Sequence, residues 1–499
     1  MPAFRKQKSR LHLELTDAGQ ATAHGGQVLV DALARRFDLW HQLDRLPGLD
    51  PRQRTGSGFF PSALIAQLIF NFTSGGISLA DAQRLGQDRV FLDLLGLART
   101  ADEATLGQWL RAQTPASVRQ VQALNARFVD WVWQQAPRAR LLHAGWTEYF
   151  FDDTEIEVTG KQFEGARRNY EGNQALSWQV LWKGPFVLDQ QLDGAGDVSE
   201  HLPMLLGEHA HRWQGEQSYL YADSASSGAP YVNAIDQAGF TAWSISYNKW
   251  TEKLERLAGE LPASQWTAEA TAPGVAPTEH YAWVKHQPGE CARSHRFACV
   301  RRRAADELFD RYAFVMCQAD EEQAPAAALE RHRLKGAKEQ GFSQLLSDLD
   351  LHHPPCAELV ANQMFYAIAT LAFNLLLALR MLEMPDDAQA WRVRTIIRHL
   401  LTVPVSVSRH ARYARAWICV PAGWLRWWRL YVQTWLPKRP AGRPVREAVD
   451  RGRSGLRAGA AAGRRNSGLG RPGRVARGGA WLQAGREGLL APSKAAKTV

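Results

Sequence analysis

The sequence predicts a mixed α/β fold in which a helical N-terminal domain precedes a sheet-containing core. Through residues 62–135, apolar residues recur at three- and four-residue intervals, which is the spacing of an amphipathic helix. From about Gly145 the pattern changes to short segments rich in aromatic and β-branched residues, which is typical of strands. Helical periodicity resumes at residues 326–349 and continues to residue 401, so helices should return after the strands.

These changes in pattern divide the chain into five predicted segments. A polar, proline-containing stretch after residue 247 carries three short strand-like segments and is interpreted as a β-rich insertion in the core. The predicted segments are a helical domain at residues 1–140, the first part of the core at 141–247, the insertion at 248–324, the second part of the core with closing helices at 325–437, and a basic tail at 438–499.

The tail is predicted to be disordered, because it has no hydrophobic periodicity with which to offset the entropy of ordering. It holds 15 Lys or Arg residues and three acidic residues, a net charge of +12, while the whole chain carries +10. Residues 1–437 therefore carry −2, so overall charge alone does not predict a polyanionic partner for the body. The Arg, Gly and Ala bias of the tail fits either a genuine basic tail or a GC-rich message read out of frame.

The five cysteines and the N-terminal residues indicate a cytoplasmic protein. Five is an odd number, and the N-terminus has no charged-then-apolar export signal. The longest apolar stretch, residues 364–379, contains Thr370 and Asn374 and is shorter than the roughly 20 residues of a membrane span. We expect a buried helix there and no membrane partner.

Acidic residues occur at three places where their carboxylates could take part in catalysis or bind a metal ion. Asp152 and Asp153 interrupt a strand, and because side chains alternate along a strand, these two point to opposite faces. Asp223 follows another apolar strand, at the edge of a sheet where ligands usually bind. Glu339 lies one helical turn after Lys335. Taken singly, each has an ordinary explanation: a solvated strand end, a helix cap or a surface ion pair.

Several separated stretches, in their order along the chain, give these residues a common context. Over residues 11–436 the chain resembles the DDE insertion-sequence transposases, whose ribonuclease-H-like catalytic core is interrupted by a β-strand insertion. The resemblance implies that fold, with the helical N-terminal domain serving DNA binding and assembly. It is carried by residues 75–82, 102–106, 152–154 continuing to 170, 221–224, 339–340 with 348–351, and 366–375.

The resemblance implies a catalytic triad of Asp152, Asp223 and Glu339. The family's first aspartate precedes a Thr or Ser by two positions, which selects Asp152 through Thr154. Asp153 is then the second choice and an additional candidate metal ligand. The 116-residue step from Asp223 to Glu339 is long enough to contain an insertion. Related transposases often place Tyr, Arg and Lys around that glutamate; the corresponding residues here are His332, Lys335 and Leu346.

The implied chemistry is metal-dependent phosphoryl transfer. Two Mg²⁺ ions about 4 Å apart activate the attacking oxygen and neutralise the transferring phosphate, with Mn²⁺ as a possible substitute. Three clustered carboxylates repel one another until a metal binds, so the metal-free site should be unsettled. Basic residues near Glu339 are predicted to contact DNA phosphates, the alternative being an ordinary solvated helix face. They are Arg331, His332, Arg333, Lys335 and Lys338.

The predicted function is that of a transposase that cleaves transposon ends and joins them to target DNA. Its partner is double-stranded DNA, both transposon ends and target, bound by a homodimer at the nucleoid. Two other functions stay open: a catalytically decayed or domesticated DNA-binding protein, and a related metal-dependent nuclease.

A Cys/His spacing and a tryptophan pair each allow a functional interpretation that is weaker than the structural one. Cys291, His295 and Cys299 have a Cys-x3-His-x3-Cys spacing that would suit structural zinc, although no fourth ligand is evident. Trp427 and Trp428, between two arginines, could stack on DNA, but burial in a helical core is the favoured interpretation.

Overall fold

The computed structural model describes residues 21–52, 58–159, 163–196, 200–269, 278–303, 309–318, 322–410 and 413–434. Contacts divide the chain into two units, Met1–Leu436 and Pro437–Val499, and all described residues belong to the first. The predicted tail and the first 20 residues lie outside the described part of the chain.

The N-terminal part is helical, as its periodicity predicts. Side chains at the starts of four helices accept hydrogen bonds from otherwise unpaired backbone N–H groups: Ser78, Asp88, Asp102 and Thr114. The helices are α1 (Gln27–Arg36), α2 (Leu39–Asp44), α3 (Pro61–Thr73), α4 (Leu79–Leu85), α5 (Arg89–Leu95), α6 (Glu103–Arg111), α7 (Pro115–Gln135) and α8 (Arg138–Leu141).

A ten-stranded mixed sheet follows, in the order β3-β4-β2-β6-β7-β11-β10-β9-β8, with β5 paired to β4. Strands β2, β6 and β7 run parallel, and their carboxyl ends share one edge. The strands are β2 (Thr147–Glu157), β3 (Arg167–Arg168), β4 (Gln174–Lys183), β5 (Phe186–Gly194), β6 (Ser218–Ala222), β7 (Ala242–Tyr247), β8 (Thr267–Ala268), β9 (Glu279–His286), β10 (His295–Arg302) and β11 (Arg311–Gln318). Helices α9 (Leu202–His209) and α10 (Ala229–Ala238) connect β5, β6 and β7.

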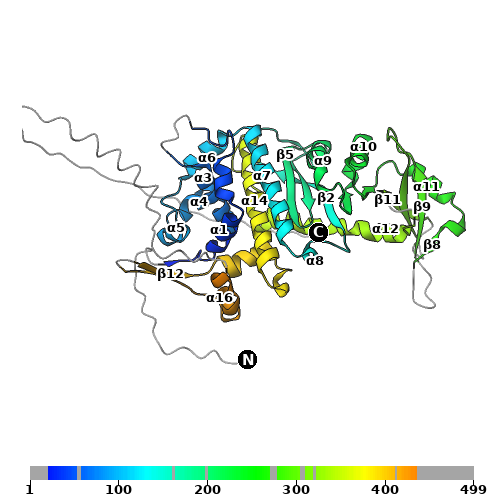
Figure 1. Ribbon diagram of the computed structural model, residues 1–499. Coiled ribbons are helices and arrows are strands. Elements are labelled where there is room, and N and C mark those ends of the chain that lie inside the picture. The colour runs from blue at the N-terminus through cyan, green and yellow to red at the C-terminus, as the bar shows by residue number, and fades with distance from the viewer. Residues whose placement is uncertain are drawn as a thin grey trace, which may run out of the picture. The chain divides into compact units, whose positions relative to one another are not determined.

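The segment predicted as a β-rich insertion does contain strands, and they continue the same sheet. Strand β11 pairs antiparallel with β7, from Phe314 opposite Tyr247 to Gln318 opposite Trp243. Helix α11 (Glu252–Gly259) contacts β9, and α12 (Pro325–His332) contacts β9, β10 and β11 before the chain returns toward the core. Figure 1 shows β9, β11 and α11 together beyond α10.

Helix α14 (Leu359–Glu383) is the central helix of the unit. It contacts α1, α3, α6 and α7, and it also contacts β5 (Figure 1). By length and composition it could cross a membrane, yet 89% of its most apolar window is buried inside the protein. The predicted buried helix at residues 364–379 is therefore confirmed as part of a longer core helix.

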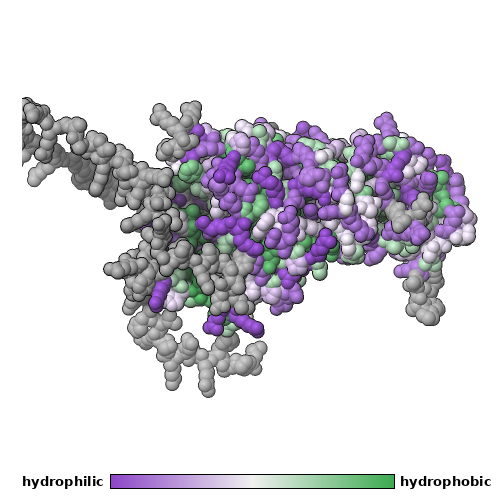
Figure 2. All heavy atoms as spheres, in the orientation of Figure 1, coloured by the Kyte–Doolittle hydropathy of each residue, from purple (hydrophilic) through white to green (hydrophobic). Residues whose placement is uncertain are grey.

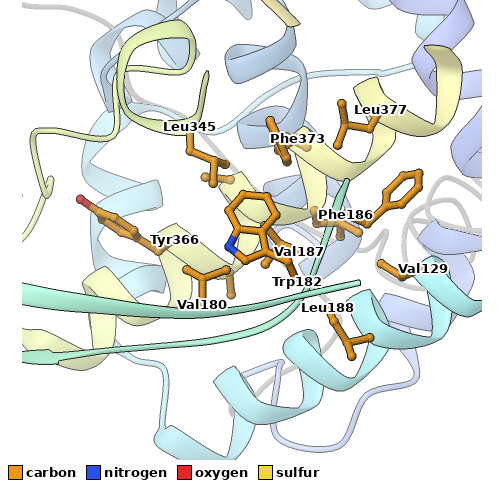
Figure 3. Close-up of a cluster of buried hydrophobic side chains, with 14 of the residues drawn as sticks. Val129, Val180, Trp182, Phe186, Val187, Leu188, Leu345, Tyr366, Phe373 and Leu377 are labelled. Atoms are coloured by element: carbon orange, nitrogen blue, oxygen red, sulfur yellow. The ribbon is translucent and has the colours of Figure 1, made fainter. Parts of the chain in front are cut away.

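The apolar core links this helix to the sheet. Figure 3 shows Trp182 of β4 surrounded by side chains of β5, α14 and the segment after α13, among them Phe186, Phe373 and Leu345. The Trp182 and Phe373 rings meet edge to face at 6.2 Å. Hydrophilic residues cover most of the face shown in Figure 2, and apolar residues lie between them.

The chain closes with short helices and a second sheet, in which β1 (Ala21–Thr22) pairs with β12 and β12 with β13. The elements after α12 are η5 (Arg333–Lys338), α13 (Glu339–Ser343), η6 (Gln344–Asp348), α14, η7 (Asp386–Ala388), α15 (Val393–Ile396), η8 (Ile397–Leu401), β12 (Val405–His410), β13 (Tyr413–Ile418), η9 (Ala422–Trp424) and α16 (Leu425–Thr434).

Candidate active site

Strand pairing places Asp152 and Asp223 on the same face of the sheet. Phe150 lies beside Tyr221 in the parallel β2–β6 pair, and their rings stack at 4.6 Å. Asp152 is two residues beyond Phe150, and Asp223 is two residues beyond Tyr221 in extended conformation (φ −86°, ψ 173°). Because strand side chains alternate, both aspartates follow their aromatic neighbours onto this face, whereas Asp153 points to the other.

The Asp223 carboxylate is not used as a helix cap. Asp223 precedes the short helix η3 (Ser224–Ser227), but its side chain makes no capping hydrogen bond there. It is 45% exposed at the carboxyl edge of the sheet. The ordinary explanation for an aspartate at this position therefore does not account for it.

Lys335 of η5 joins the two carboxylates. Its Nζ donates a hydrogen bond to Asp152 Oδ2 at 2.9 Å and lies 4.0 Å from Asp223 Oδ1. The Lys335 and Asp152 side chains are only 17% and 12% exposed. The sequence prediction placed Lys335 near Glu339 as a phosphate contact, and its position between the two aspartates was missed.

Burial makes the negative charge of this cluster costly. It raises the pKa of Asp152, with Lys335 opposing the shift and Asp223 adding to it. The pKa of Asp153 is raised to about 7, first by burial and then by the charges of Asp152 and Asp223. The carboxylates at this edge therefore favour a bound cation.

The donor set fits a divalent metal ion. Asp152 and Asp223 supply hard oxygen ligands of the kind that Mg²⁺ prefers, and they already converge on a positive charge. Their partly buried position excludes much of the solvent that would otherwise weaken the attraction.

Glu339 lies outside this cluster. It is the exposed first residue of α13, and no interaction found among the described residues joins it to Asp152 or Asp223. The segment before it, η5, is a 3₁₀ helix, in which residues three apart share a face. Lys335 therefore shares a face with Lys338 and bonds Asp152, so a surface ion pair with Lys335, the ordinary explanation of Glu339, does not apply.

His332 anchors the end of α12 to the sheet. Its two ring nitrogens lie 2.7 Å from Ser244 Oγ and 2.8 Å from Ser246 Oγ, both on β7. Burial lowers the pKa of His332 to about 4, with the charge of Lys335 acting in the same direction. The imidazole is thus neutral and fully occupied by protein groups, so it positions η5 and is not free to hold a phosphate.

Two more predicted phosphate contacts also face protein groups. The Arg331 guanidinium lies 4.0 Å from the ring centre of Tyr219 and 4.1 Å from that of Trp146. The Lys338 ammonium donates to the Gly184 carbonyl and lies over the Phe150 ring. Burial lowers the pKa of Lys338 to about 7.

Arg333 alone of the five is largely exposed, at 58%, in a pair with Glu330. The predicted surface of five phosphate-binding residues is therefore corrected. Arg331 and His332 instead hold the end of α12 against the sheet, and Lys335 and Lys338 hold η5 there.

A second cluster of metal-ligating residue types lies on β5 and α9. Asp189, Glu208 and His209 each offer a ligand atom within 4.8 Å of the others. However, Arg119 bonds both Asp189 oxygens at 3.0 Å, and His209 Nε2 lies 2.6 Å from Asp189 Oδ2. Arg119 also pairs with Glu208. These partners satisfy the carboxylates as a buried ion-pair network.

The alternative zinc site does not form. His295 and Cys299 both lie on β10, four residues apart, which separates them by about 13 Å along the strand. His295 lies instead 3.4 Å from Asp236, and Cys299 is buried in the core.

The favoured interpretation of the tryptophan pair is confirmed. Trp428 is 3% exposed, and Trp427 donates from its indole nitrogen to the Glu383 carbonyl at 2.9 Å.

A pocket of about 360 Å³ opens among the loops after β6 and β7. These loops leave the same edge of the sheet as Asp223. Its lining includes Tyr231, Tyr247, Lys249 and Trp250, and Trp250 is 83% exposed with a left-handed φ of 56°. Nothing in the sequence pattern singled these residues out, because they approach one another only through the parallel strand ends.

Comparison with known proteins identifies a family for this chain. The family model described as Transposase DDE domain group 1 matches residues 5–425. No match is found among curated proteins. The family match covers most of the sequence and includes both aspartates that converge on Lys335. The chain therefore belongs to the transposase DDE domain group 1 family.

Proposed function

We propose that this protein cleaves transposon ends and joins them to target DNA by two-metal phosphoryl transfer. The observation that carries the proposal is the convergence of Asp152 and Asp223 on one cation at the carboxyl edge of the parallel strands. Family membership supports it, because a DDE transposase domain implies a metal-dependent enzyme that processes DNA.

Asp152 and Asp223 would hold the metal, and Glu339 is proposed as the third carboxylate. Bound Mg²⁺ supplies Lewis-acid stabilisation of the phosphate and a more acidic attacking oxygen. The Lys335 ammonium lies between the two carboxylates, so a metal ion held by Asp152 and Asp223 would take over the charge that Lys335 now neutralises. Glu339 is exposed and begins the helix that directly follows η5, the segment that carries Lys335, which supports it as the third carboxylate.

Double-stranded DNA is the proposed partner, bound by a homodimer that bridges two ends in the cytoplasm, at the nucleoid. The pocket beside the strand ends offers aromatic rings and Lys249, a combination that suits stacking of a base and attraction of its phosphate. Asp153 is proposed as an auxiliary group of the site and not as a first ligand, because it lies on the other face of β2.

The test compares Asp152→Asn, Asp223→Asn and Glu339→Gln with the Asp153→Asn control. Purified proteins are incubated with Mg²⁺, duplexes carrying the transposon ends and a supercoiled target plasmid, and cleavage and joining are measured. We expect the three variants to lose both activities, by at least 1000-fold, and to retain DNA binding.

Each contrary outcome names another function. Cleavage without joining by the unmodified protein would indicate a metal-dependent nuclease. Binding without cleavage would indicate a decayed or domesticated DNA-binding protein. Loss of cleavage on changing Asp153 but not Asp152 would place the metal on the other face of β2.

A further inference from the structure

The closing region, residues 390–434, differs in charge from the part of the chain that precedes it. It holds eight arginines and no acidic residue or lysine. The whole chain carries +10 and the tail from Lys438 carries +12, so residues 1–389 carry −10. Ahead of the tail, the excess of basic over acidic residues thus lies in this last segment, which extends beyond the end of the family match at residue 425.

The closing region is anchored to the body by aromatic side chains. Trp391 meets Trp424 at 4.9 Å between ring centres, and Trp424 meets Trp427, which in turn bonds Glu383 of α14. Trp428 is buried beside them. This contact face fixes α16 in place.

Arginines lie on the opposite side of these anchors. On α16, Arg426 and Arg429 are exposed and three residues apart, so they share a helix face that excludes Trp427 and Trp428. Arg398 is exposed on η8, next to His399, whose ring lies 5.4 Å from that of Trp391. On α16, the arginine face and the tryptophan face are therefore distinct.

The β12–β13 ribbon presents polar and aromatic groups on one face. Ser406 lies opposite Trp417 and Ser408 opposite Arg415 in the strand register, so all four side chains share a face. Arg415 is exposed and Trp417 is 50% exposed. Strand β1 pairs with β12 only at Val405 and Ser406, so within the described residues the rest of the hairpin is two-stranded and narrow enough to enter the major groove of duplex DNA.

From these placements we infer that the closing region is a duplex-binding surface, on which Arg415, Arg426 and Arg429 contact DNA phosphates. The inference deepens the proposed function, on which it rests, by assigning the duplex to one surface. A polyanion is attracted to this region and repelled by the acidic body, so the charge distribution itself orients the DNA.

The test uses full-length protein without Mg²⁺ in an Asp152→Asn background, so that binding is measured apart from catalysis. Affinity for a fluorescein-labelled 30-base-pair duplex of random sequence is measured by anisotropy from 50 to 200 mM NaCl. Each lost phosphate contact lowers the slope of log K against log salt by about 0.9. We expect R415A/R426A/R429A to lose about two to three units of slope and at least tenfold in affinity at 100 mM salt.

The matched control removes three exposed arginines from the acidic body, as R127A/R138A/R256A, and should leave the slope unchanged. The charge-retaining variant R415K/R426K/R429K should keep most of the slope. Thermal unfolding of each variant shows that the fold is retained.

An unchanged slope in R415A/R426A/R429A, or an equal loss in the control, would overturn the inference. Loss of self-association in sedimentation with an unchanged slope would also overturn it and assign the surface to the acidic body of a second copy. If the unmodified protein binds DNA with the expected salt dependence but does not cleave it, the proposed function alone is contradicted.

Discussion

A methyl group at position 341 would lie 2.9 Å from the Trp182 indole, closer than side-chain contacts in proteins normally come. Gly341 is in the middle of α13, and Trp182 is fully buried on β4. Core side chains such as Phe373 and Leu345 lie beside the indole in Figure 3, so a displacement of the ring would disturb their packing. The absence of a side chain at Gly341 thus sets how closely the helix that begins at Glu339 approaches the sheet.

Gly341→Ala should displace α13 and so move Glu339. We expect a loss of about 1–3 kcal/mol in the free energy of unfolding, typical of an overpacked core. At a temperature where the variant remains folded, its rate of DNA cleavage should still be lower than that of the unmodified protein, because Glu339 is displaced. Gly336→Ala is the control, because a Cβ there meets nothing within 4 Å. Equal activity of the two variants would show that the position of α13 does not matter to the chemistry.

Lys335→Met should destabilise the metal-free protein by about 3 kcal/mol, because it leaves the partly buried Asp152 without its counter-charge. Mg²⁺ should restore much of that loss, so the stabilisation on adding Mg²⁺ should be larger in the variant than in the unmodified protein. Chemical denaturation with and without excess Mg²⁺ measures how much the ion adds to the free energy of unfolding of each protein. Arg333→Met, which breaks an exposed pair, is the control. An equal Mg²⁺ effect in both proteins would mean that Lys335 does not occupy the metal position.

His332 should make the protein less stable in acid. Its pKa is about 4 in the folded protein, against an ordinary value of 6.5, so between these values the unfolded chain binds a proton that the folded chain does not. Stability is therefore unaffected above about pH 7 and falls as pH drops, by about 2 kcal/mol from pH 7 to pH 5. His332→Gln should remove this part of the pH dependence, and the exposed His352→Gln should not. If the free energy of unfolding fell equally between pH 7 and pH 5 in all three proteins, His332 would not be the group responsible.

Arg119→Met should cost about 3–5 kcal/mol, because Asp189 is 1% exposed and loses both bonds from the guanidinium. Arg127→Met, at an exposed position of the same helix, should cost little. Because Asp189, Glu208 and His209 should hold no metal ion, removing metal with EDTA should not lower the unfolding midpoint by acting on these residues. A strong EDTA effect that disappears in Asp189→Asn, combined with a mild effect of Arg119→Met, would show that the cluster holds a metal ion after all.

Strand alternation let the sequence predict much of the candidate site. It separates Asp152 from Asp153 onto opposite faces of the strand, since period-two geometry is common to all strands. The position of Asp223 at a strand end was predictable for the same reason. Their meeting at Lys335 was not, because 183 residues separate Asp152 from Lys335 and no local rule relates them.

The helical side of the site was predicted less well. Assuming 3.6 residues per turn placed Lys335 with Glu339, but η5 has three residues per turn and places Lys335 with Lys338. The shorter period is imposed by contacts that sequence periodicity does not reveal, such as the His332 bonds to two serines of β7. The strands after residue 247 were found, whereas their pairing with β7 depends on long-range register.

That pairing also guards the protein against misassembly. Without β8 to β11, β7 would end the sheet with a row of unpaired backbone N–H and C=O groups beside the strand that leads to Asp223. Bare edges of this kind recruit strands from other molecules and promote aggregation. Strand β11 occupies this edge, and the short β8 ends the sheet with only two residues, so the outer strands shield the catalytic strands from joining another chain.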